Sequence, residues 1–141
     1  MGFSLDDRLA ASSHLVATTG GIQVRLADDA RYVWLLLVPE QDGVSELHEL
    51  EDAARAALLE LANDVGIWMK TRFGADKINT AAIGNVVAQL HLHVVARHRG
   101  DDAWPAPIWG VGEPQALSGE AQASLIAEVA GFLQTRGKGW N

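Results

Sequence analysis

One stretch of the chain, residues 32–38, is apolar without interruption and ends at Pro39. A short run of this kind, with no polar alternation, is typical of a strand that is buried on both faces. The sequence therefore predicts a sheet with this strand near its centre.

Residues 50–73 follow a different period. Apolar side chains recur there every three or four residues, at Leu50, Ala54, Leu58, Leu61, Val65 and Trp68. This spacing places them on one face of a long helix, and Gly74 follows where a left-handed residue commonly ends a helix. A second helix is expected to begin after Ser118 as its N-cap, with its inner face at Leu125, Val129 and Leu133.

Shorter segments complete the pattern. Residues 5–12 suggest a short helix, and four segments are expected to form further strands: residues 14–18, 22–27, 77–83 and 89–96. Gly20 and Gly21 mark a hairpin turn between the first two. The order of elements predicts an α+β fold, with about five strands in a mainly antiparallel sheet and helices on one face. We expect one domain over residues 1–141, since the length suits one domain rather than two.

Composition excludes several classes of partner and site. The formal net charge of −7 disfavours a nucleic acid polymer as the main partner. The chain has no cysteine, so it has neither disulfides nor thiolate metal sites. No segment reaches the roughly 18 apolar residues of a membrane span, and Asp6 and Asp7 stand where a signal peptide needs positive charge. We expect a soluble, cytoplasmic protein with no membrane partner.

The segment from residue 89 to residue 97 carries the chemistry. In a strand, residues two apart share a face, so Leu90, Leu92, Val94 and Ala96 should face the core. The polar set then points the other way, towards a cleft: Gln89, His91, His93 and Arg97. Two imidazoles beside a guanidinium are a costly arrangement unless an anion, such as a phosphate, lies among them.

Histidine suits reaction at such a phosphate. An imidazole with its ordinary pKa of about 6.5 is largely neutral and nucleophilic near pH 7. Attack of His91 on phosphorus would form a phosphoramidate and divide one displacement into two easier ones. His93 and Gln89 flank His91 and would stabilise the developing charge, with backbone N–H groups of the turn upstream at Gly84, Asn85 and Val86.

These residues resemble a known family. Residues 89–95, QLHLHVV, with IGNVVA before them, are similar to the His-φ-His-φ-His-φ-φ strand of the histidine triad (HIT) family, where φ is an apolar residue. Gln89 replaces the first histidine, His91 falls on the nucleophile and His93 on the third histidine. Residues 102–110 resemble a bacterial subgroup that shares the glutamine. The resemblance covers about residues 20 to 100 and implies a HIT-like fold.

The resemblance also implies residue roles. The turn Gly84-Asn85-Val86 would contact phosphate, and Asn79 would be a further phosphate ligand. The acidic pair before residues 32–38 matches the position that binds the ribose hydroxyls; Asp29 is the first candidate and Asp28 the second. The implied activity is nucleotide hydrolysis or nucleotidyl transfer through a nucleotidyl-histidine on His91. Candidate substrates are nucleoside phosphoramidates, dinucleoside polyphosphates and aminoacyl-adenylates. A homodimer is expected, and no metal is required, although a divalent ion could accompany a polyphosphate.

Other interpretations remain open at this point. The chain could be a non-catalytic nucleotide-binding or regulatory module that has lost turnover with the first histidine. His91 and His93 could instead bind a metal, because H-x-H is a common ligand pair, or have no task at all. Arg97 could be a solvated charge at a strand end rather than a phosphate ligand. Trp104 and Trp109 either cap the cleft or fill a dimer interface, and we expect the interface.

Overall fold

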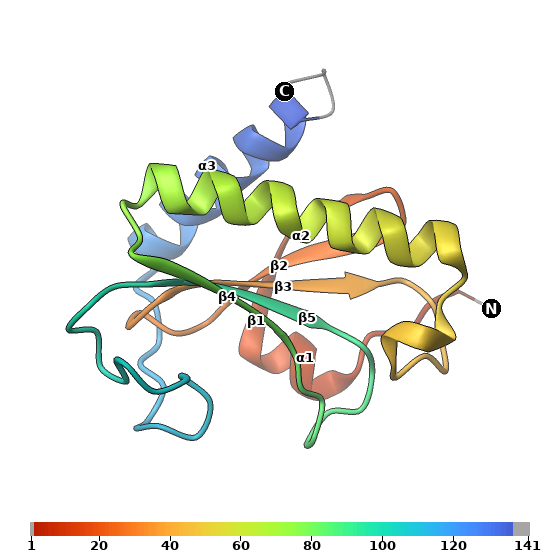
Figure 1. Ribbon diagram of the computed structural model, residues 1–141, viewed down its shortest axis with the longest axis horizontal. Helices are drawn as coiled ribbons and strands as arrows, with labels where there is room; N and C mark the ends of the chain where they lie inside the picture. Colours follow the sequence, from red (N-terminus) through yellow and green to blue (C-terminus); the bar gives the residue numbers. More distant parts are fainter. Residues whose placement is uncertain (1, 137–141) are drawn as a thin grey trace.

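The computed structural model describes residues 2–136, which form a five-stranded sheet with three α-helices (Figure 1). The strands are β1 (Ser13–Thr19), β2 (Ile22–Ala27), β3 (Val33–Pro39), β4 (Lys77–Ala82) and β5 (Leu92–Arg97). Their spatial order is β1-β2-β3-β5-β4, and all neighbouring pairs are antiparallel. The predicted α+β class and the antiparallel sheet are confirmed.

Helices cover the sheet on both faces rather than on one. The long helix α2 (Asp52–Arg72) and the last helix α3 (Gly119–Arg136) lie on the same face, above the sheet in Figure 1. The short α1 (Asp7–Ser12) lies on the opposite face, where Leu9 packs with Leu36 and Val38 of β3. The prediction of helices on one face was therefore wrong for α1. A 3-10 turn, η1 (Leu47–Glu49), precedes α2.

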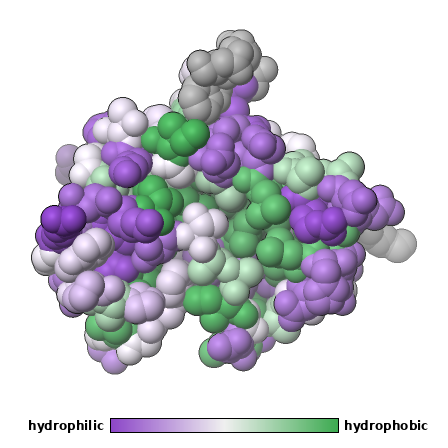
Figure 2. Space-filling model, in the orientation of Figure 1, coloured by the Kyte–Doolittle hydropathy of each residue, from purple (hydrophilic) through white to green (hydrophobic). Residues whose placement is uncertain are grey.

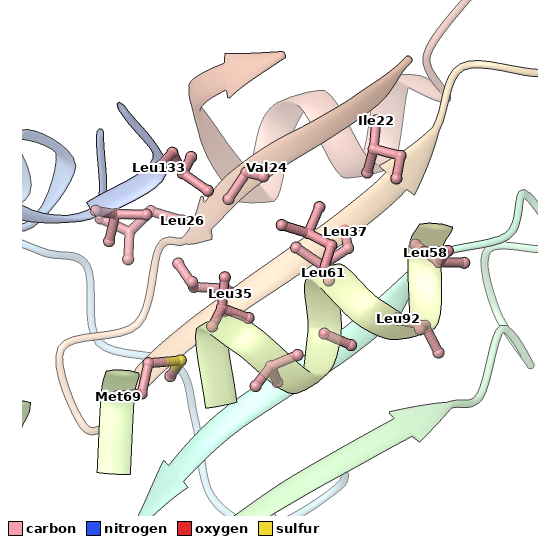
Figure 3. Close-up of a cluster of buried hydrophobic side chains, with 14 of the residues drawn as sticks. Ile22, Val24, Leu26, Leu35, Leu37, Leu58, Leu61, Met69, Leu92 and Leu133 are labelled. Atoms are coloured by element: carbon pink, nitrogen blue, oxygen red, sulfur yellow. The ribbon is translucent and has the colours of Figure 1, made fainter. Parts of the chain in front are cut away.

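The main apolar core lies between the sheet and the two long helices (Figure 3). Val24 on β2, Leu35 and Leu37 on β3 and Leu58 of α2 are fully buried and belong to this one cluster. Burial of one such side chain stabilises the fold by about 1.5–3 kcal/mol. The apolar residues that recur with the helical period thus lie on the face of α2 that packs against the sheet.

Strand β3 sits between β2 and β5, as the apolar run predicted. Leu35 faces the helices, whereas Leu36 faces α1 and lies beside His93 in the register of β3 and β5. Residues on β3 therefore divide between two layers even though the run shows no alternation. The face opposite the long helices, which we call the polar face, is covered by α1 and by residues 98–117.

The outer surface is mixed in character. On the side seen in Figure 2, hydrophobic residues gather in the middle, between hydrophilic areas at the left and right. Over residues 2–136, no helix has both the length and the apolar composition that crossing a bilayer demands.

Candidate functional site

A cleft of about 400 Å³ opens on the polar face. It lies between the turn at residues 83–87 and the loop at residues 108–114, with His91 and His93 in its wall. A second compartment of about 250 Å³ extends towards Leu9 of α1 and shares both histidines with the first. The sequence prediction that the two imidazoles come together at a pocket is confirmed, because their ring centroids lie 4.8 Å apart.

His91 lies just before β5, and its ring is held by the backbone. Its Nδ1 lies 2.7 Å from the carbonyl oxygen of Gln89. A carbonyl oxygen only accepts hydrogen bonds, so Nδ1 carries the hydrogen of the neutral ring. Nε2 then keeps its lone pair, which is the form that a nucleophile needs.

His93 lies on β5, buried beside His91. Its Nδ1 lies 3.0 Å from the indole Nε1 of Trp34. Its ring packs edge-on against Trp109, with the two ring centroids 5.1 Å apart. Burial, and then the nearby charge of a protonated His91, lower the pKa of His93 from 6.5 to about 3. This side chain is therefore neutral across the physiological range and cannot serve there as an acid.

Gln89 is not where the pleat predicted. Strand β5 begins at Leu92, so alternation does not extend to Gln89. Its side-chain oxygen accepts from the backbone N–H of Asp6 at 2.8 Å, and its amide nitrogen donates to the carbonyl of Ser4 at 3.0 Å. Gln89 thus ties down the segment before α1, and the prediction that its side chain stabilises charge beside His91 is corrected to this anchoring contact.

The turn upstream of the histidines lines the cleft as predicted, with Gly84, Asn85 and Val86 all in its wall. Gly84 has φ +66°, and a Cβ there would lie 3.2 Å from the carbonyl oxygen of Val87. Glycine is needed at this position because other L residues rarely adopt such a backbone. Arg8 of α1 donates to the carbonyl of Val86 at 3.0 Å, which links α1 to the turn.

Asp29 also lines the cleft, and it is paired. Its carboxylate accepts from the side chain of Arg31 at 2.9 Å and from the backbone N–H of Arg31 at 3.0 Å. Burial alone would raise the pKa of Asp29, but these hydrogen bonds outweigh it and leave that pKa below its ordinary value. Asp28 lines only the second compartment and accepts from the backbone N–H of Leu117.

Asn79 and Arg97 lie outside the cleft. The guanidinium of Arg97 is buried and bonds Asp101 through Nε at 2.8 Å, the carbonyl of Ala106, and the side-chain oxygen of Asn79 at 2.8 Å. These contacts hold residues 98–106 against the sheet. The expectation that Asn79 and Arg97 contact phosphate is corrected to this structural role, and the solvated alternative for Arg97 is wrong as well.

Comparison with known proteins decides the family. The model of the HIT domain matches residues 8–100. The chain belongs to the HIT domain family. Proteins of this family are generally nucleotide-binding hydrolases or transferases. No curated protein sequence matches the chain at a significant level.

Solved structures agree with this assignment. A histidine triad protein from Sinorhizobium meliloti is 40% identical, with a TM-score of 0.88 over 90% of this chain and 94% of that one. One from Marinobacter aquaeolei is 38% identical, with a TM-score of 0.92 over 96% and 98%. A hypothetical histidine triad nucleotide-binding protein from Sulfolobus tokodaii shares the fold at 18% identity, with a TM-score of 0.66 over 87% and 85%.

Two tryptophans of this HIT domain contribute to the site, and one does not. Trp109 lines the cleft, and the dimer interface that we expected for it stays a prediction. Trp104 instead lies against Arg97, with the guanidinium 5.5 Å from its ring. Trp34, which belongs to the apolar run that predicted a buried strand, lines the cleft and bonds His93.

Sequence reasoning missed Trp34 and Arg31 as site residues. Trp34 lies inside the apolar run, and only the register that pairs it with Val95 brings its ring next to His93. Arg31 lies two residues after Asp29 in the sequence. The residue types alone did not show whether the two side chains form a buried ion pair or are exposed in a turn. Over residues 2–136, no three side chains of His, Cys, Asp or Glu gather as metal ligands would.

Proposed function

We propose that this HIT domain hydrolyses or transfers the nucleotidyl group of a nucleoside phosphate derivative through a nucleotidyl-histidine on His91. The observation that carries the proposal is the contact between Nδ1 of His91 and the carbonyl of Gln89. That contact directs the lone pair to Nε2 in a ring that lines the cleft.

The reaction then has two balanced steps. The Nε2–P bond forms while the bond from phosphorus to the leaving group breaks, and its electron pair departs with that group. The imidazolium that forms keeps its Nδ1–H, which still donates a hydrogen bond to the carbonyl oxygen of Gln89. A water oxygen next adds to phosphorus, Nε2 recovers its electron pair, and the proton of the water passes to solvent, which releases the nucleoside monophosphate.

The α-phosphate would lie between the histidines and the turn. His93 and the backbone N–H groups at Gly84, Asn85 and Val86 supply donors to its oxygens, and the Asn85 amide adds another. Such donors act most strongly where charge develops in the transition state. Candidate substrates are nucleoside phosphoramidates, dinucleoside polyphosphates and aminoacyl-adenylates.

The ribose is expected at Asp29, with Asp28 as the second candidate. Asp29 lines both compartments, and Asp28 lines only the one that reaches α1. The pairing with Arg31 leaves Asp29 ionised, which is the form that accepts from two ribose hydroxyls. The nucleoside would then occupy the second compartment and the leaving group the first.

The scheme proceeds without a metal ion, and a divalent ion could accompany a polyphosphate substrate.

We also propose a homodimer in solution. Strand β4 ends the sheet over residues 2–136, and it leaves an edge available for pairing. Light scattering on the purified chain measures the assembly directly, and a monomer at micromolar concentration would contradict this part of the proposal.

The test of function is turnover of an adenosine 5′-phosphoramidate. His91→Ala should reduce hydrolysis to background, because it removes the nucleophile, while adenosine monophosphate still binds. His48→Ala is the matched control, since His48 is exposed and lies outside the cleft. Intact-protein mass spectrometry after rapid quenching should find an adduct of one nucleoside monophosphate on the parent and not on His91→Ala.

Two results separate the alternatives. Equal turnover by the parent and His91→Ala would contradict catalysis by His91. Nucleotide binding by the parent, without turnover of any of the three substrate types, would favour the non-catalytic module instead.

A further inference from the structure

Trp34 makes a contact with His93 that goes beyond packing. Trp34 lies on β3 opposite Val95, and its ring reaches across the polar face towards the histidine. The indole Nε1 lies 3.0 Å from Nδ1 of His93. An indole nitrogen carries a hydrogen and has no lone pair available, so it can only donate. Nδ1 of His93 must therefore be the acceptor.

This direction fixes the form of the His93 ring. With the lone pair on Nδ1, the hydrogen of the neutral imidazole lies on Nε2. The other neutral tautomer would set two N–H groups against each other at 3.0 Å, and so would the imidazolium. One donor thus opposes both alternatives at once, and burial of the ring opposes the charged form further.

The two histidines consequently carry opposite tautomers. His91 faces a carbonyl, which only accepts, and keeps its lone pair on Nε2. His93 faces an indole, which only donates, and keeps its hydrogen on Nε2. At a centroid separation of 4.8 Å, the pair offers one nucleophilic nitrogen and one hydrogen-bond donor. A second lone pair in place of that donor would repel a phosphoryl oxygen.

We propose that Trp34 is a positioning residue, which holds His93 as the tautomer that donates from Nε2 to the phosphoryl group. The inference rests on the proposed function for the identity of the acceptor, but the tautomer itself follows from Trp34 and His93 alone. The other charged or titratable groups lining the two compartments are His91, Asp28, Asp29 and Arg31. Asp29 and Arg31 are paired with each other.

Trp109 supplies a matched control. It also touches His93, with ring centroids 5.1 Å apart and the planes at 69°. Its own Nε1 is buried and has no hydrogen-bond partner over residues 2–136. Trp109 therefore packs against the histidine without selecting a tautomer, whereas Trp34 packs and also donates.

The experiment compares Trp34→Phe with Trp109→Phe by nitrogen-15 NMR of the histidine side chains at neutral pH without ligand. In the parent and in Trp109→Phe, His93 should show a protonated Nε2 and an unprotonated Nδ1. In Trp34→Phe the two nitrogens should move towards the averaged shifts of exchanging tautomers. A parent with its hydrogen on Nδ1, or unchanged shifts in Trp34→Phe, would overturn the role of Trp34 whatever the enzyme does.

Kinetics then connect the tautomer with the reaction. Trp34→Phe should lower kcat by roughly tenfold, less than the loss of about 10²–10³ on removing such a donor entirely, with a smaller change in KM. Its pH profile should also show a further loss of activity on the acidic side, from protonation of His93, that Trp109→Phe lacks. An equal loss of kcat in both variants would reduce Trp34 to a packing role, whereas a parent without turnover would contradict the proposed function and leave the NMR result standing.

Discussion

The two faces of the sheet differ in the kinds of side chain that they bury. The face under α2 and α3 is apolar throughout, and its core forms one continuous cluster (Figure 3). The polar face also buries apolar side chains, such as Leu36 and Val38, but it adds the buried charged and polar ones: Ser13, Arg25, Asp29, His91, His93 and Arg97. Burying a polar group costs stability unless it is hydrogen-bonded. Each of these six side chains has such a partner.

The continuous apolar core and the candidate site thus lie on opposite faces of the sheet. The apolar face is expected to accept apolar substitutions that conserve volume at modest cost, because dispersion and the hydrophobic effect have no preferred direction. The polar groups of the other face depend on direction, because a hydrogen bond forms only where a donor meets an acceptor. The cleft lies on the second face, so the contacts that fold residues 98–117 also orient the site.

The largest expected effect is at Arg97. Arg97→Leu should lower the free energy of unfolding by about 3–5 kcal/mol, because it leaves Asp101 as a buried and unpaired charge. Chemical denaturation measures the change. The double variant Arg97→Leu with Asp101→Leu should recover part of the loss. A cost below that of an exposed pair, about 1 kcal/mol, would contradict the claim that direction governs this face.

On the apolar face, Leu37→Ala should cost about 2–5 kcal/mol through the cavity it creates. Nucleotide binding by the protein that remains folded should not change, because Leu37 faces α2 and not the cleft. Isothermal titration at low temperature measures that affinity. A weakened affinity would show that the two faces are coupled.

His93 should make stability depend on pH. Its pKa is about 3 when folded and about 6.5 when unfolded, so the unfolded chain binds the proton first as pH falls. The stability from this group is complete above pH 6.5 and declines towards pH 3, by up to about 1.4 kcal/mol per pH unit. Denaturation midpoints across this range should fall less steeply in His93→Gln than in the parent, whereas the exposed control His48→Gln should match the parent.

The smallest effect is expected at Gln89. Gln89→Ala removes two hydrogen bonds to the segment before α1 and should cost about 1–2 kcal/mol. Limited proteolysis should then cleave near Ser4 and Asp6 sooner than in the parent. Gln89→His is informative beside it, because imidazole cannot both donate and accept at the spacing of an amide. Unchanged cleavage in both variants would show that the contacts of Gln89 do not hold the segment.

Local patterns predicted much of this. The apolar run became β3, the helical period became α2, and the Oγ of Ser118 caps α3 by accepting from Ala121. Alternation placed His93 correctly because β5 includes it. The same rule held at His91, which immediately precedes the strand, and failed further upstream at Gln89, because regular pleating is lost away from the hydrogen-bonded ladder.

Contacts between distant segments could not be read in this way. Arg97 and Asn79 have residue types that suit phosphate, but the pairing of β4 with β5 brings them to each other, and the loop after β5 brings Asp101 to Arg97. Trp34 is separated by 59 residues from the histidine that it bonds.

The sequence by itself determined the elements, the class of the fold and the presence of two histidines at one cleft, because hydrophobic period and strand alternation are properties of neighbouring residues. The tertiary structure alone decided which nitrogen of each histidine carries the hydrogen and which polar side chains became structural. Those outcomes depend on partners brought close by strand register and loop packing, which no local pattern encodes.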